Sequence, residues 1–169
     1  LRRSSAASDV YKRQSLFNGI QAKGLVLINT LRKPSERLNW INNAMANAVK
    51  FGGTSLILDM TLPVIASPKF LSKMKDNALK YENYLGLDDY NGVSKLMHGG
   101  FTTNWDFDWS KLDLPVLVLT GHFDKVFRIE DDINNLIKNM KNVKRIEVPE
   151  CGHLIPVSYT HLRAHETYP

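Results

Sequence analysis

The chain alternates short, continuous apolar runs with longer stretches whose apolar residues recur at helical spacing. The runs 24–30, 114–120 and 146–148 are bounded by glycine, proline or polar residues, which is the pattern of strands in a parallel sheet. The first run is typical of a strand buried on both faces. Residues 129–140 carry apolar side chains at helical spacing. This order of strand, helix and strand predicts an α/β fold.

The segment 31–110 lacks strand-like alternation and consists of helix-like stretches separated by turn signals. Lysines on one of these stretches could suggest an anion site, but acidic neighbours dilute their charge, and long cationic side chains commonly solvate a helix face. We therefore expect Lys69, Lys73, Lys75 and Lys80 to face solvent. The expected helices span residues 34–51, 54–62, 68–79 and 88–98. A break at Gly52-Gly53 separates the first two. The last helix is interrupted at Gly92 and ends at Gly99-Gly100.

An acid and a histidine follow two neighbouring strands. Asp124 comes after the run 114–120 in Gly121-His122-Phe123-Asp124, and His153 follows the run 146–148 in Gly152-His153. Open α/β sheets carry their chemistry at the carboxyl ends of the strands, so both side chains are expected at one edge. A histidine there can act as a general base, and a carboxylate can fix its tautomer.

Other side chains near this edge have simpler explanations. His122 follows its strand too early to face the acid, so we expect it at a pocket rim or in a structural contact. Asp131 and Asp132 suit the first turn of a helix, where negative charge complements the dipole. Cys151 is poorly placed to attack along the line that His153 would serve. His98 is expected to be a helix cap or a surface residue.

These motifs resemble the carboxyl-terminal half of the α/β-hydrolase family. Its members carry a P-V-L-V-L-x-G strand followed by a G-x-x-D turn with the triad acid, and a later G-H with the triad histidine. The resemblance assigns Asp124 and His153 as catalytic residues. It implies an incomplete α/β-hydrolase sheet of about three parallel strands with helices, in which residues 15–30 and 111–156 form the core and 31–110 an inserted helical cap.

The nucleophile of such a family stands upstream in a G-x-S-x-G elbow, and no such pentapeptide occurs in this chain. The resemblance therefore implies a fragment of a serine hydrolase acting on an ester, lactone, thioester or amide. This chain alone is expected to be inactive and poorly folded. A dehalogenase with an aspartate nucleophile, a C–C bond hydrolase and a non-catalytic binding protein remain alternatives.

Aromatic residues of the cap are candidates for a substrate pocket, since small ligands bind in mostly apolar clefts. Phe101 and Trp105 are the expected substrate-binding residues. Trp40 and Trp109 are better explained as core or hinge residues.

Both ends of the chain resemble translated sequencing adapter, at residues 1–14 and 157–169, as expected for a metagenomic sequence. The first of these segments carries a net charge of +3, so the formal charge of +5 falls to +2 without it. The pI of 9.3 then gives no reason to expect nucleic-acid binding.

Cysteine usage indicates a reducing, cytoplasmic compartment, and no apolar run is long enough to span a membrane. The resemblance implies a small-molecule substrate. The lone Cys151 excludes an internal disulfide, and no Cys and His cluster has zinc spacing, so no metal and no cofactor are expected.

Overall fold

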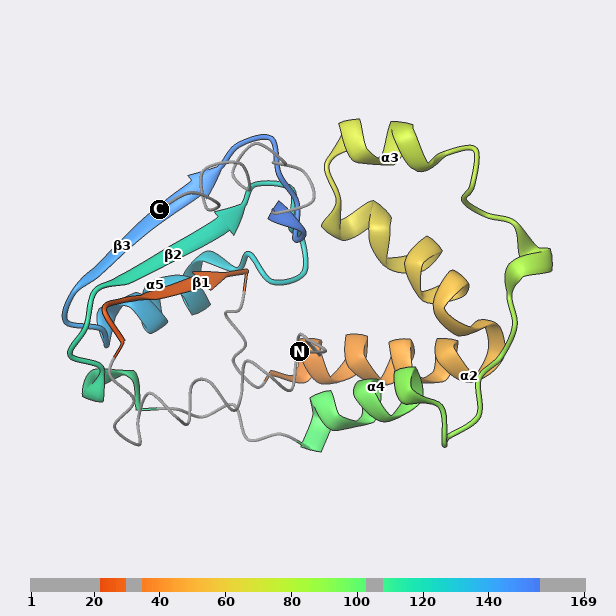
Figure 1. The fold of residues 1–169 in the computed structure, drawn as a ribbon, viewed down its shortest axis with the longest axis horizontal. Coiled ribbons are helices and arrows are strands. Elements are labelled where there is room, and N and C mark those ends of the chain that lie inside the picture. The colour runs from red at the N-terminus through yellow and green to blue at the C-terminus, as the bar shows by residue number, and fades with distance from the viewer. Residues whose placement is uncertain (1–21, 30–34, 103–107, 156–169) are drawn as a thin grey trace.

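A computed structural model describes residues 22–29, 35–102 and 108–155 of the chain. Three strands, β1 (Leu25–Ile28), β2 (Val116–Gly121) and β3 (Val143–Val148), form a parallel sheet in the order β1-β2-β3. The register pairs Leu27 with Val118, and Val118 with Arg145. The predicted α/β class with about three parallel strands is confirmed (Figure 1).

The third strand begins earlier than its apolar run indicated, at Val143 instead of Ile146. Its polar residues Lys144 and Arg145 obscured the strand in the sequence. The half-buried positions Val143 and Arg145 alternate with the exposed Lys144 and Ile146, as they do on a strand with one solvated face.

One face of the sheet is covered by α5 (Glu130–Lys138), whose fully buried Ile133 packs on the strands. The opposite side is more open, and Val26 of β1 is 54% exposed. The prediction that this strand is buried on both faces is therefore wrong for the described residues, because α5 covers only one of them. The core comprises Leu27, Leu112, Val116, Val118, Ile133 and Met140, with Trp109 packed against it.

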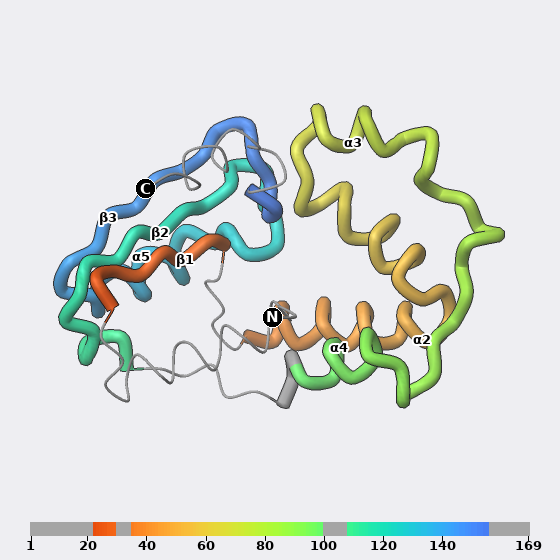
Figure 2. The backbone as a smooth tube through the Cα atoms, in the orientation of Figure 1, coloured from red at the N-terminus to blue at the C-terminus, as the bar shows by residue number. Residues whose placement is uncertain are grey.

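The helices between β1 and β2 begin with α2 (Glu36–Ile65), which joins two predicted helices across a kink. Ser35 caps its start, where the side chain accepts a hydrogen bond from the Leu38 N–H. The kink lies at Gly53, whose φ of 59° is in the left-handed region that favours glycine. Figures 1 and 2 show the result: α2 runs away from the sheet, turns, and its second half returns toward the carboxyl ends of the strands.

Two predicted helices have different bounds in the structure. Helix α3 (Pro68–Met74) ends well before Leu79, and the backbone N–H groups of Asn77 and Ala78 close a turn on the Met74 carbonyl. A short 3-10 helix, Tyr81–Asn83, follows.

Helix α4 (Gly92–Thr102) starts at the predicted interruption and continues through the predicted end at Gly99-Gly100. The carboxylate of Asp88 accepts hydrogen bonds from the N–H groups of Tyr90 and Asn91, which forms a turn before the helix. A glycine costs a helix only about 1 kcal/mol relative to alanine, so packing against α2 can override it.

A second apolar cluster holds the helical segment together. It consists of Ala48, Val49 and Ile57 of α2, with Leu56, Leu87, Val93 and Met97 packed against them. Trp40 lies outside this cluster and is 80% exposed, so a core position for this residue is wrong. Trp109, in the 3-10 helix Trp109–Lys111, contacts the sheet core and confirms the same prediction for that residue.

By length and composition alone, α2 could cross a membrane. Its kink at Gly53 interrupts a straight path, and one third of its apolar window is buried against the rest of the chain.

Candidate active site

The acid loop begins where β2 ends. Asp124 is fully buried, and its N–H donates to the carbonyl of Gly121. Its Oδ1 accepts hydrogen bonds from the backbone N–H groups of Val126, at 3.1 Å, and Phe127, at 2.9 Å. A buried carboxylate needs such partners to offset its lost hydration. One carboxylate oxygen therefore fixes the loop, and Oδ2 remains for another contact.

That contact is with His153. Its Nδ1 lies 2.7 Å from Oδ2 of Asp124, although the two residues are far apart in the sequence. The imidazole ring is 28% exposed and packs on the ring of Phe127 at a centroid distance of 4.5 Å. The predicted pair is thus brought together. Because Nδ1 faces the carboxylate, Nε2 is the ring nitrogen that remains for proton exchange.

The end of α2 contacts both loops. The Val64 carbonyl accepts a hydrogen bond from the N–H of Lys125, at 2.8 Å, and the Ile65 carbonyl accepts one from the N–H of His153, at 2.6 Å. The last carbonyls of a helix have no partner within the helix. Here they hold the acid loop and the histidine loop.

The start of α2 contacts the acid loop as well. The guanidinium of Arg37 donates to the carbonyl of Lys125, at 2.9 Å, and to that of Val126, at 3.2 Å. The two ends of one kinked helix therefore both hold the loop that carries Asp124.

Gly152 allows this close packing of loops and helix. A Cβ atom at this position would collide with the carbonyl oxygen of Ile65 and would lie 2.8 Å from the Cα of Ala66. Steric contact thus explains why a glycine precedes the histidine in the Gly152-His153 motif, since only a residue without a side chain fits beneath the end of α2.

A small pocket with mainly apolar walls adjoins the histidine loop. It lies where the end of α2, the side of α3 and the residues flanking His153 meet. Its walls are formed by Leu62, Ile65, Ala66, Phe70, Gly152 and Leu154.

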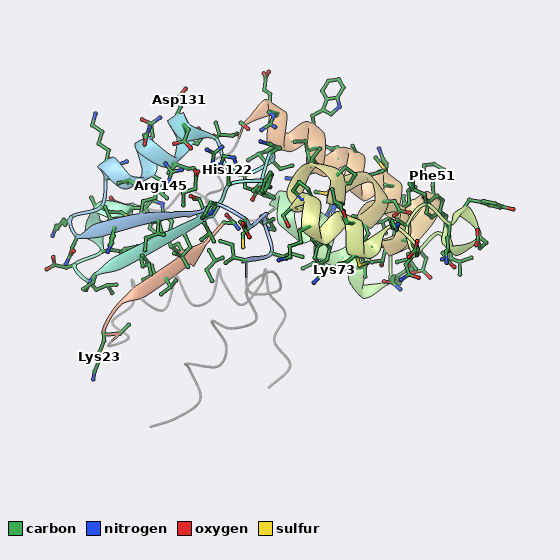
Figure 3. All side chains as sticks on the ribbon, turned by 90° about the horizontal axis from the view of Figure 1, so that it is seen from above. Lys23, Phe51, Lys73, His122, Asp131 and Arg145 are labelled. Carbon is green, nitrogen blue, oxygen red and sulfur yellow. The ribbon has the colours of Figure 1, made fainter. Side chains whose placement is uncertain are left out.

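His122 belongs to a surface charge cluster instead of the acid and histidine pair. Its Nδ1 lies 3.0 Å from Oε1 of Glu147, whose other oxygen accepts a 2.6 Å hydrogen bond from Arg128. The hydrogen bonds from His122 and Arg128 lower the pKa of Glu147. Arg145 binds Glu130 with both terminal nitrogens and lowers its pKa. Figure 3 shows His122 and Arg145 near the start of α5.

The other candidates are distributed as follows. Asp131 and Asp132 lie in the first turn of α5, as predicted. Cys151 is fully buried, and His98 is exposed inside α4 and not at its end. The lysines of α3 and the following turn are exposed, among them Lys73, labelled in Figure 3.

The predicted substrate-binding residues are not placed by the structure. Trp105 lies outside the described residues, and Phe101 falls in α4 without a described side chain. Within residues 22–29, 35–102 and 108–155, no group of three His, Cys, Asp or Glu side chains could hold a metal ion.

Two contributors to the site were missed from the sequence. In the sequence, Arg37 is recognisable only as part of a helix start, and Asn29 only as a polar residue at the end of an apolar run. Asn29 accepts a hydrogen bond from the N–H of Gly121 and donates to the carbonyls of Gly152 and His153. The sequence did offer one signal for Asn29: it lies at the carboxyl end of β1, and the carboxyl ends of the strands form the edge of the sheet that also carries Asp124.

Comparison with protein-family models and with curated proteins gave no match. Solved structures do match. An esterase from Thermogutta terrifontis, with malate bound, aligns at a TM-score of 0.67 and 18% identity, covering 94% of this chain and 58% of that one.

Two further structures align in the same way. MGS-M2, an α/β hydrolase from a Medee basin deep-sea metagenome library, gives a TM-score of 0.61 at 20% identity, covering 83% of this chain and 54% of that one. The enol-lactonase of Burkholderia xenovorans LB400 gives a TM-score of 0.62 at 13% identity, covering 85% of this chain and 54% of that one. This chain thus spans little more than half the length of the structures it matches. Over that span, it has the α/β-hydrolase fold.

Proposed function

We propose that this chain is part of a hydrolase that cleaves an ester, lactone, thioester or amide in a small molecule. Its nucleophile would be a serine that this chain does not contain. The observation that carries the proposal is the 2.7 Å contact between His153 Nδ1 and the buried carboxylate of Asp124. The similar esterase and enol-lactonase support the same class of reaction.

In the proposed mechanism, Nε2 of His153 takes the proton of the serine hydroxyl as its oxygen attacks the carbonyl carbon. The imidazolium then gives this proton to the leaving alcohol, thiol or amine as the bond to the carbonyl carbon breaks. Water repeats the sequence on the acyl-enzyme and releases the acid and the serine. Asp124 keeps the imidazole tautomer fixed and stabilises the imidazolium.

We further propose that residues 31–110 are a cap over this site. Phe101 and Trp105 are its proposed substrate-binding residues, since small ligands bind in mostly apolar clefts. No cofactor, metal or nucleic acid has a role in this mechanism, and we propose a cytoplasmic location for the whole protein.

The proposal is tested on the whole protein, after reading the source DNA outward through the adapter-like ends at residues 1–14 and 157–169. A G-x-S-x-G elbow and hydrolysis of an activated ester, such as a p-nitrophenyl ester, are expected. Asp124→Asn should lower kcat by about 10⁴-fold, since an amide favours the wrong imidazole tautomer. His153→Ala should be similarly impaired, whereas His122→Ala serves as the matched control and should retain most of the activity.

Other results would point elsewhere. An aspartate at the elbow together with halide release would identify a dehalogenase. A folded whole protein that binds small molecules without turnover would be a non-catalytic relative. The chain as it stands, without an elbow serine, should give no acyl-enzyme burst with the activated ester.

A further inference from the structure

We propose that Asn29 is a positioning residue that holds the His153 loop against the end of the acid strand. A role of Asn29 in catalysis rests on the proposed function, whereas its effect on the position of the His153 side chain does not. Asn29 follows β1 directly, is 5% exposed, and has a φ of 46°. Asparagine tolerates this left-handed conformation better than most residues. Its own N–H donates to the Leu119 carbonyl of β2, which fixes its backbone.

The amide side chain joins two loops that the sequence places far apart. Its Oδ1 accepts a 2.9 Å hydrogen bond from the N–H of Gly121, at the end of β2. Its Nδ2 donates to the carbonyl of His153, at 2.6 Å, and to that of Gly152, at 3.2 Å. Three backbone groups are thus satisfied at once in a buried place, where an unpaired polar group would be unfavourable.

Only an amide meets these requirements together. It offers one acceptor to Gly121 and two N–H donors to the carbonyls of the histidine loop. An aspartate would keep the acceptor but would place a carboxylate oxygen against the carbonyl oxygens of Gly152 and His153. A glycine would keep the left-handed backbone and lose all three contacts.

The contacts of Asn29 act on the backbone that carries the imidazole. The N–H of His153 is held by Ile65, and its carbonyl is held by Asn29, so both peptide groups flanking its Cα are fixed. This leaves the side chain with little freedom relative to Asp124. A misplacement of about 1 Å in a reacting group can lower a rate by about 10²-fold.

The first test is nuclear magnetic resonance of the whole protein labelled with ¹⁵N in its histidines. The readout is the signal of the His153 Nδ1–H proton, which a hydrogen bond to a carboxylate shifts strongly downfield. We compare Asn29→Asp and Asn29→Gly with Asn42→Ala, which alters another buried asparagine, in α2 and away from the histidine loop.

Loss or a large shift of this signal in both Asn29 variants, with the signal kept in Asn42→Ala, is the expected result. The proposal fails if both Asn29 variants keep the wild-type signal. It also fails if they lose the signals of the whole chain under conditions where Asn42→Ala stays folded, since Asn29 would then act on the fold and not on the histidine loop.

The second test uses the same variants in the whole protein. Asn29→Asp should lower kcat by about 10- to 100-fold with little change in KM, because the substrate pocket is untouched while the base is misplaced. Unchanged kcat would contradict the proposal. If the whole protein hydrolyses no ester but the His153 signal still depends on Asn29, the proposed function fails and the positioning role stands.

Discussion

His153 and Ile65 are joined through their main chains by a 2.6 Å hydrogen bond from the histidine N–H to the isoleucine carbonyl. The bond connects the last turn of a helix inserted between two strands to the loop after a third strand. The position of the histidine therefore depends on the helical segment as well as on the sheet.

Gly152→Ala should destabilise the chain and separate the histidine loop from α2. The added methyl group would meet backbone atoms of Ile65 and Ala66, which cannot rotate away as a side chain could. We expect a loss of about 1–3 kcal/mol in the free energy of unfolding, as is typical of overpacking. Chemical denaturation of wild type and variant measures it.

Gly99→Ala is the matched control for this substitution. A Cβ atom at Gly99, within α4, meets nothing within 4 Å. Alanine stabilises a helix interior by up to about 1 kcal/mol relative to glycine, so this variant should be equal to wild type or more stable. Equal destabilisation by both substitutions would refute the steric argument for Gly152.

Arg37→Ala should loosen the acid loop with little effect on global stability. Its guanidinium is exposed and makes two hydrogen bonds to backbone carbonyls, at Lys125 and Val126. We expect faster hydrogen exchange at the amides of Val126 and Phe127, whose N–H groups bind Asp124. Lys50→Ala, which removes another cation of α2 paired with Asp89, should leave these amides unchanged. Equal exchange rates in wild type and Arg37→Ala would count against the role of Arg37.

Glu147 should stabilise the chain fully above about pH 4.5 and lose this contribution progressively at lower pH. Hydrogen bonds from His122 and Arg128 lower the pKa of this carboxyl below its ordinary value of 4.5. A lowered pKa in the folded state stabilises the protein above the unfolded-state pKa, and this stabilisation is lost as the pH falls through the folded-state value.

Glu147→Gln should therefore reduce the free energy of unfolding at pH 7 and match wild type at strongly acidic pH. The side chain is partly exposed, so solvent screening limits the difference to about 1 kcal/mol or less. Denaturation between pH 3 and 7 measures it, with Glu150→Gln as the control on an exposed glutamate. A difference that grows toward acidic pH would contradict the assignment.

Ile133→Ala should cost about 2–5 kcal/mol, because Ile133 is fully buried between α5 and the sheet. Ile146→Ala removes the same atoms from β3, where the residue is 41% exposed. This second variant should cost much less. Similar losses in the free energy of unfolding would mean that the two faces of the sheet are covered to the same extent.

Local patterns were sufficient to predict much of this fold. The apolar runs located β1 and β2, and Ser35 was expected within the helix start that it caps. The proximity of Asp124 and His153 was predictable too, because parallel strands bring their carboxyl ends to one edge of a sheet. The boundaries of α4 were missed since glycine disfavours a helix only weakly, while the contacts that outweigh it come from α2.

The support of the site could not be predicted in the same way. Gly152 and Ile65 meet only because α2 turns back at Gly53, and nothing local to either residue signals that contact. Asn29 shows the same difficulty: its three partners lie about 90 to 125 positions along the chain. Its residue type suits the end of a strand in many settings, so its role depends on the tertiary structure.

The turn at Gly53 also bears on how such a protein can change over time. Because α2 leaves and returns to the same loop, its two anchors, Arg37 and Val64, both contact the backbone of Lys125, while its bend projects away from the sheet (Figure 2). Phe51, 79% exposed beside the bend, marks the part farthest from these anchors (Figure 3). Exposed positions beside the bend, such as Phe51, can therefore be replaced, whereas Val49 and the buried Gly53 cannot, because they set the path by which α2 returns to the histidine loop.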